Sequence, residues 1–150
     1  MHNAVIPGIT HTLSLQLNDH HLVTAFAPHF STLVDLPPVF ATAFMVGFME
    51  WACIEALKPY LPDGENTVGT HVYLSHVAPM PTGMPLETKI TAQVELVEVK
   101  GRALRFRVDC HDACGLIGSG FHERRVIGTV TDTGRFTAKL RKKASALLAA

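Results

Sequence analysis

Residues 39–57 form a long apolar stretch, and this stretch constrains the fold more than any other. Its sequence, VFATAFMVGFMEWACIEAL, contains only two formal charges, Glu50 and Glu55. Two prolines precede it and one follows shortly after it, as is typical of helix boundaries. The pattern predicts one helix of about five turns at 3.6 residues per turn. Because the helix is apolar on nearly every side, we expect it to be buried in a core.

Glu50 is the exceptional residue of this helix. Its helical neighbours three and four positions away are Val46, Gly47, Cys53 and Ile54. A carboxylate on such a face must be paired with a cation, protonated, or used in chemistry. Thr42 lies eight positions earlier, about 12 Å away along the axis and roughly 80° around it. Both side chains can therefore border one cavity.

Length, charge and cysteine content limit the class of protein. A chain of 150 residues predicts a single domain, residues 1–150. Lysine plus arginine equals aspartate plus glutamate at 13 each, so the charge indicates neither nucleic acid nor a membrane surface as partner. Three cysteines do not make a disulfide framework, and the N-terminus lacks the pattern of a signal peptide. We expect a soluble cytoplasmic protein.

The rest of the chain predicts an antiparallel sheet. Alternating apolar and polar residues predict strands at 11–17, 67–77, 86–99, 104–110 and 116–130. The last three are joined by turns and form a meander with one polar face. One buried helix with such a sheet makes an α+β arrangement in which the sheet wraps the helix.

The strand at 67–77 carries a candidate site residue. Its apolar face is predicted to hold Val68, Thr70, Val72, Leu74 and His76. The imidazole is therefore expected to point toward the helix.

Two segments have no firm assignment from the pattern. Residues 22–38 place apolar side chains among prolines, which fits either a lid over a pocket or, as the pattern favours, a loop that covers one end of the core. Residues 135–143, RFTAKLRKK, are basic and fit a surface helix or a strand.

Glu50 and His76 are the main candidates for chemistry. A carboxylate and an imidazole on facing inner surfaces can share acid–base work or activate water. The alternatives are that a buried arginine neutralises Glu50, or that His76 is a hydrogen-bonded core histidine. Arg124 and Arg125 lie on opposite faces of one strand, so one of them can face the interior.

Three further positions allow a structural and a functional interpretation. Thr42 is either a helix-start residue that bonds the backbone or a substrate contact. Gly47 is expected to let another backbone approach the helix. Gly69 either frees a backbone N–H to face a carbonyl oxygen or marks a bulge.

The stretch 110–122 contains residue types that bind metals. The two cysteines of CHDAC (110–114), even with His122 nearby, do not have a standard zinc spacing, and we expect no metal. Gly118 and Gly120 do not lead from a strand into a helix, which excludes a dinucleotide fingerprint. Close packing of a bent strand on the helix is expected instead.

Three stretches together resemble the fluoroacetyl-CoA thioesterases of the hotdog-fold superfamily. They are FATAFMVGFMEWAC (40–53), VGT (68–70) followed by His76, and HDACGLIGSGFHER (111–124). The resemblance extends from about Val39 to Lys143. It implies a hotdog fold, hydrolysis of an acyl-CoA thioester with no cofactor beyond the substrate's own CoA, and a homodimer with active sites at the interface.

The resemblance also implies roles for individual residues. Thr42, Glu50 and His76 match the catalytic trio, with Glu50 attacking the thioester carbon or activating water and His76 moving the proton. Gly69 matches a residue that helps to place the thioester carbonyl, and Arg124 matches the arginine of the HER motif close to the site.

The segment before the helix and the start of the helix indicate which acyl group the site accepts. Leu36 stands where the fluoroacetyl enzyme has an aromatic residue in its lid, which puts fluoroacetate specificity in doubt. Bulky Phe40, Phe44 and Met45 near the start of the helix favour a small acyl group. Leu36 and Phe40 are therefore the expected acyl-group contacts.

Two other functions compete with the thioesterase. A hotdog hydratase or dehydratase would use a carboxylate and a histidine on a different motif, which the sequence lacks. A non-catalytic acyl-CoA-binding or sensing domain would keep the pocket and lose the chemistry. The presence of all three of Thr42, Glu50 and His76 favours the enzyme.

Overall fold

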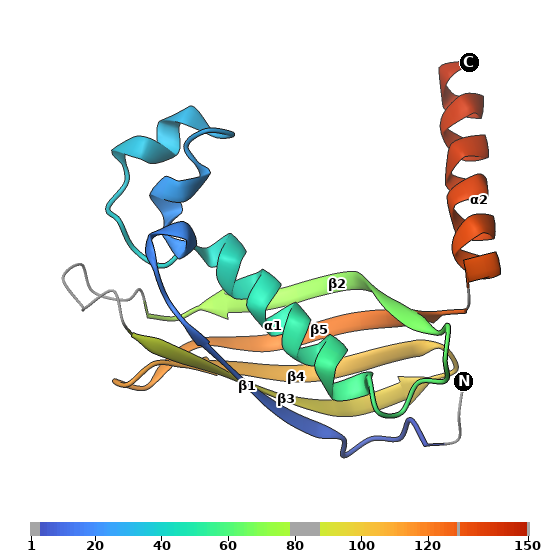
Figure 1. The fold of residues 1–150 in the computed structure, drawn as a ribbon, viewed down its shortest axis with the longest axis horizontal. Coiled ribbons are helices and arrows are strands. Elements are labelled where there is room, and N and C mark those ends of the chain that lie inside the picture. The colour runs from blue at the N-terminus through green and yellow to red at the C-terminus, as the bar shows by residue number, and fades with distance from the viewer. Residues whose placement is uncertain (1–3, 79–87, 129, 150) are drawn as a thin grey trace.

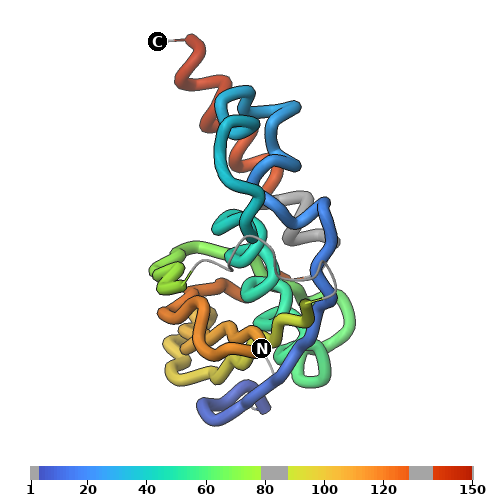
Figure 2. Tube along the Cα trace, turned by 90° about the vertical axis from the view of Figure 1, so that its left-hand side faces the viewer, coloured from blue at the N-terminus to red at the C-terminus, as the bar shows by residue number. Residues whose placement is uncertain are grey.

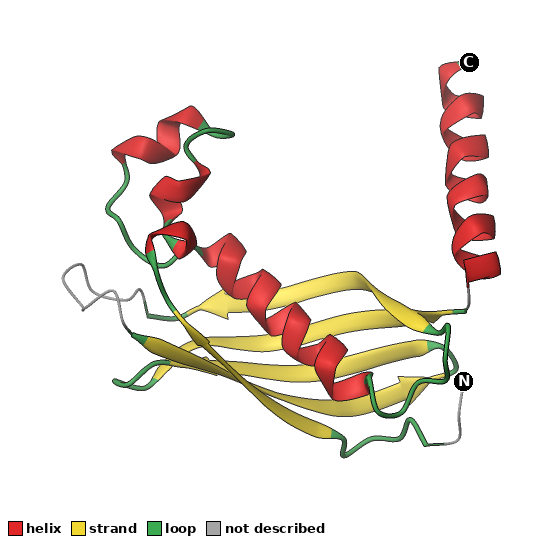
Figure 3. Ribbon diagram, in the orientation of Figure 1, coloured by secondary structure: helices red, strands yellow, loops and turns green. Residues whose placement is uncertain are grey.

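A five-stranded antiparallel sheet curves around one long helix in the computed structural model, which describes residues 4–78, 88–128 and 130–149 (Figure 1). The strands are β1 (Thr10–Gln16), β2 (Asn66–His76), β3 (Lys89–Lys100), β4 (Ala103–His111) and β5 (Leu116–Ile127). Their order is β1-β3-β4-β5-β2. The helices are α1 (Thr42–Leu57) and α2 (Val130–Leu148), with short 3-10 helices η1 (Asp19–His21), η2 (Val23–Phe26) and η3 (Ser31–Asp35) (Figure 3). The predicted α+β class and the β3–β4–β5 meander are confirmed.

The core lies between α1 and the inner face of the sheet. Alternate residues of β3 and β4 are buried as predicted: Ile90, Ala92, Val94, Leu96, Leu104, Phe106, Val108 and Cys110. On β5, a Cβ at Gly118 would lie 2.5 Å from the Met45 sulfur. Gly118 therefore lets β5 lie close against α1, as expected from the sequence.

The predicted helix differs from α1 in its start and in its burial. The helix begins at Thr42 rather than at residue 39, because Phe40 pairs with Leu22 in an isolated antiparallel bridge and Ala41 is extended. One side is buried against the sheet, but Trp51 on the other side is 45% exposed. Full burial was therefore wrong for a single chain, since the sheet covers only one side. Gly47 was also misassigned, because a Cβ there would meet nothing within 4 Å.

A bulge in β2 changes which residues face the helix. The register with β5 shifts between Gly69 and His71, so that residue 70 has no partner in the ladder. One extra residue reverses the alternation of side chains. Thr67 and Gly69 therefore face inward in place of Val68 and Thr70, whereas the inward placement of His76 is as predicted.

Two helical segments extend beyond the sheet on the side where α1 lies (Figure 2). The segment with η2 and η3 lies beyond the start of α1 and exposes Phe30 and Val34 to 59% and 61%. The exposure of these two side chains differs from the prediction that residues 22–38 form a loop covering one end of the core. The basic end of the chain forms α2, whose residues 137–148 are all exposed.

Some predictions lie outside the described residues. These are the loop at 79–85 and the first residues of the strand predicted at 86–99. Within the ranges that are described, the structure contains no helix with the length and apolar character needed to cross a membrane. The cytoplasmic location stays a prediction.

Candidate active site

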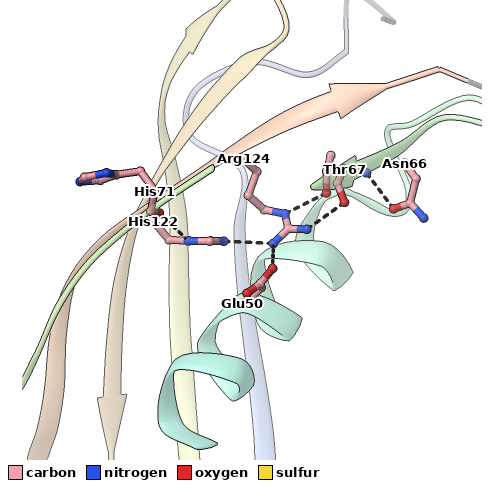
Figure 4. Close-up of polar contacts among 6 residues, drawn as sticks. All are labelled: Glu50, Asn66, Thr67, His71, His122 and Arg124. Carbon is pink, nitrogen blue, oxygen red and sulfur yellow. Dashed lines mark hydrogen bonds and ion pairs between the residues drawn. The ribbon is translucent and has the colours of Figure 1, made fainter. Parts of the chain in front are cut away.

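Arg124 organises the inner surface of the sheet opposite the middle of α1 (Figure 4). Its side chain is 2% exposed, and its Nη1 donates to Glu50 Oε1 at 2.8 Å. Its Nε donates to Thr67 Oγ1 at 2.8 Å, and its Nη2 donates to the Thr67 carbonyl at 2.9 Å. The expected alternative, a buried arginine that pairs Glu50, is thus present, and Arg125 on the other face is exposed.

His122 completes this cluster, and sequence reasoning missed it as a site residue. Its Nδ1 lies 2.9 Å from the His71 carbonyl oxygen, which can only accept, so Nδ1 carries the proton. Its Nε2 is then free to accept from Arg124 Nη1 at 3.0 Å. Burial, and then the charge of Arg124, lower the pKa of His122, which stays neutral. The sequence could have indicated His122 as a site residue, because it lies two residues before Arg124 and therefore on the same face of the strand.

Gly69 lies directly against the Glu50 carboxylate. A Cβ at this position would lie 2.9 Å from Glu50 Oε1 and 3.2 Å from His122 Cε1. Any larger residue would therefore displace the carboxylate. The Glu50 side chain is itself 37% exposed, so the carboxylate is held on one side by Arg124 and is accessible on the other.

Thr42 and His76 form a second pair. Thr42 Oγ1 lies 2.8 Å from His76 Nδ1, so the threonine contacts a side chain and does not cap the helix. His76 Nε2 is buried and finds no hydrogen-bond partner within the part of the chain that the structure describes. Burial also lowers the pKa of His76, which favours a neutral ring. A buried nitrogen left without a partner is costly and is a common feature of functional sites.

The two pairs are separate within one chain. Because His76 contacts Thr42, it lies two helical turns, about 12 Å, from the position of Glu50. The expected direct pairing of Glu50 with His76 is therefore replaced by Glu50–Arg124 and Thr42–His76. Phe40 is 1% exposed and packs edge-on to His76 with ring centroids 6.2 Å apart, while Leu36 is 45% exposed at the end of η3. The catalytic and acyl-contact roles of these residues stay predictions.

A separate cavity of about 490 Å³ lies between α1 and the segment that precedes it. It is lined by Leu15, His21, Phe26, Ala43, Phe44, Gly47, Phe48 and Trp51. None of the candidate catalytic residues lines it, and its only titratable side chain is His21. The cavity has no pair of groups for acid–base chemistry, so we place the candidate site at Glu50.

The stretch 110–114 includes the end of β4 and part of the bend that connects β4 to β5, in which Asp112 has a structural role. Its Oδ1 accepts from the backbone N–H groups of Cys114 and Gly115. Throughout residues 4–78, 88–128 and 130–149, three or more His, Cys, Asp or Glu side chains do not gather as metal ligands would.

A curved antiparallel sheet around one long helix is the hotdog fold, and the comparisons below place the chain among the thioesterases of that fold. A family model described as fluoroacetyl-CoA-specific thioesterase matches residues 23–129. A fluoroacetyl-CoA thioesterase from Streptantibioticus cattleyicolor is 43% identical over 127 residues, which cover 85% of this chain and 86% of the relative. The chain belongs to the fluoroacetyl-CoA-specific thioesterase family.

Solved structures agree with this assignment. The fluoroacetyl-CoA thioesterase FlK superposes with a TM-score of 0.82 at 39% identity, covering 94% of this chain and 98% of FlK. A threonine-to-serine variant of FlK in complex with acetyl-CoA gives 0.81 at 39% identity, covering 93% and 98%. A thioesterase superfamily member from Thermus thermophilus gives 0.79 at 22% identity, covering 97% and 99%, which supports the fold alone.

Proposed function

We propose that this chain hydrolyses the thioester of a short-chain acyl-CoA to the free acid and CoA. The observation that carries the proposal is the Glu50 carboxylate, which Arg124 holds at 2.8 Å while more than a third of the side chain stays accessible. The chain belongs to a family of fluoroacetyl-CoA-specific thioesterases, and thioester hydrolysis is a reaction in which such a carboxylate can act. A purely acyl-CoA-binding domain would not need an accessible carboxylate beside a buried cation.

The residues divide the chemistry among them. Glu50 attacks the thioester carbon or removes a proton from the water that attacks it, and Arg124 holds the carboxylate in a fixed position. The C–S bond then breaks, and the thiolate of CoA takes a proton that comes from the attacking water. If Glu50 is the nucleophile, a water molecule hydrolyses the acyl–Glu50 anhydride in a second step and supplies this proton. We assign the relay of the proton to His76, whose orientation Thr42 fixes. The Gly69 N–H is our candidate donor to the oxyanion.

The acyl group we propose is small, with fluoroacetyl as one candidate. The S. cattleyicolor relative is named for fluoroacetyl-CoA. Phe40 fills the space behind His76 with 1% exposure, which favours a short group at the thioester. Leu36 is an aliphatic lid residue and distinguishes this chain from the aromatic lid that the resemblance implies.

We also propose a homodimer with active sites at the interface. β2 is an edge strand of eleven residues that exposes Val72 and Tyr73 to 46% and 70%, and an exposed edge of this kind favours pairing with another strand. The open side of α1, with Trp51 exposed, would be covered in the same assembly. Such a site draws the Glu50–Arg124 pair from one protomer and the Thr42–His76 pair from its partner.

The activity is tested by thiol release from purified protein. Acetyl-, fluoroacetyl- and propionyl-CoA and a long-chain acyl-CoA are compared, and we expect release to fall as the acyl chain lengthens. CoA binding without thiol release from any of them would instead favour the binding domain.

The shared site is tested by mixing two inactive variants. Neither Glu50→Gln nor His76→Ala should hydrolyse acetyl-CoA alone. After unfolding and refolding together, a mixed dimer keeps one site with both native residues, so about a quarter of wild-type activity should return. No recovery, with mixed dimers demonstrated by mass spectrometry, would place each site within one chain.

A further inference from the structure

The helix α2 is unlike the rest of the molecule in both packing and charge. It stands clear of the sheet at the end of β5 (Figure 1). Lys139, Arg141, Lys142 and Lys143 are all exposed along it. Residues 137–148 of α2 are exposed, so over this part of the helix packing contributes little to its stability.

The charge of the chain is divided between α2 and the remainder. Of 13 basic and 13 acidic residues, α2 contains five basic residues and one acidic residue. The remainder therefore has eight basic and twelve acidic residues and a net charge of −4, while α2 carries +4. An acyl-CoA is a polyanion through its pyrophosphate and 3′-phosphate, so the body of the protein would repel the substrate that we propose for it.

We infer that α2 is the binding element for the phosphates of the CoA moiety. This inference rests on the proposed function, because it takes its ligand from the proposed substrate. Lys139, Lys142 and Lys143 have the i, i+3, i+4 spacing that places side chains on one helix face. Three ammonium groups on one face give a convergent cationic surface for phosphate oxygens.

The α2 lysines are separated along the chain from Arg124 and the candidate site. Arg124 lies near the end of β5, and α2 begins three residues after that strand ends. Lys139 and Lys143 then lie about 14 and 20 Å along the helix from Val130. The pantetheine arm of CoA likewise separates the thioester from the phosphates, so the two ends of this ligand require two separate binding regions.

The test replaces Lys139, Lys142 and Lys143 together with glutamine, which has a similar helix propensity. The KM for acetyl-CoA at low salt should rise about tenfold with kcat unchanged, the size expected of three screened surface contacts. Hydrolysis of S-acetyl-N-acetylcysteamine, which has no phosphates, should not change. By calorimetry, wild-type binding should weaken from CoA to dephospho-CoA to pantetheine, and the triple variant should lose this order.

A matched control separates a local site from a general field effect. Replacement of Lys58, Lys89 and Lys100 with glutamine removes the same charge from exposed positions outside α2. An equal rise in KM in this control, or an unchanged KM in the α2 variant, would overturn the assignment, and binding to anionic vesicles with unchanged KM would assign α2 to a membrane surface instead. Absence of thiol release from both wild-type thioester reactions would remove the proposed function while the CoA calorimetry still tested α2.

Discussion

Glu50→Gln is expected to lower kcat/KM for acetyl-CoA by at least about a hundredfold, the lower end of what a nucleophile or general base contributes. The amide keeps an oxygen that can accept from Arg124 Nη1, so the geometry of the cluster is retained. What is lost is the negative charge that attacks the thioester or activates water. Thiol release at saturating and limiting substrate measures the effect.

Stability provides the check that Glu50→Gln remains folded. The free energy of unfolding should fall by only about 1 kcal/mol, because the side chain is 37% exposed and solvent screens its ion pair. Glu55→Gln is the matched control, since it makes the same change in the same helix at a residue whose partner is the exposed Lys58. Full activity in Glu50→Gln would refute the mechanism proposed for this site.

Arg124→Met is expected to give the largest loss of stability, about 2–4 kcal/mol in the free energy of unfolding. Methionine fills much of the volume but leaves Thr67 Oγ1, the Thr67 carbonyl and His122 Nε2 without their donor. It also frees the Glu50 carboxylate from its fixed position, so activity should fall with stability. Denaturant titration and thiol release measure the two effects.

Two further variants test why Arg124→Met should lower the free energy of unfolding. Arg124→Lys keeps the charge but cannot reproduce the forked contacts, so it should recover only part of the stability. Arg125→Met removes an arginine from the exposed face of the same strand and should change the free energy of unfolding by less than about 0.5 kcal/mol. Equal losses in Arg124→Met and Arg125→Met would contradict the importance of the buried cluster.

The sequence predicted the elements because their burial patterns are local. The apolar run at 39–57 marked the helix without showing which of its sides is buried, whereas the alternation in β3 and β4 directly reflects which side chains meet the core. Glu50 was identifiable because a lone carboxylate among apolar neighbours has few explanations. The alternation left Arg124 as one of two adjacent arginines, the family resemblance favoured Arg124, and the structure shows that Arg124 is the buried one.

The pairing of functional groups required coordinates. A one-residue bulge at position 70 sets the face on which Gly69 lies, and it confirms the bulge that was one of two interpretations of this glycine. The alternation by itself did not show that the bulge would reverse the faces of β2. The partner of each polar side chain depends on strand order, since β2 pairs with β5 although residues 77–115 separate the two strands in the chain. The sequence by itself therefore determined the class of fold, the elements and the unusual carboxylate. Only the tertiary structure decided that Glu50 meets Arg124, that His76 meets Thr42 and that His122 joins the cluster, because these contacts are made between strands and helix and not along the chain.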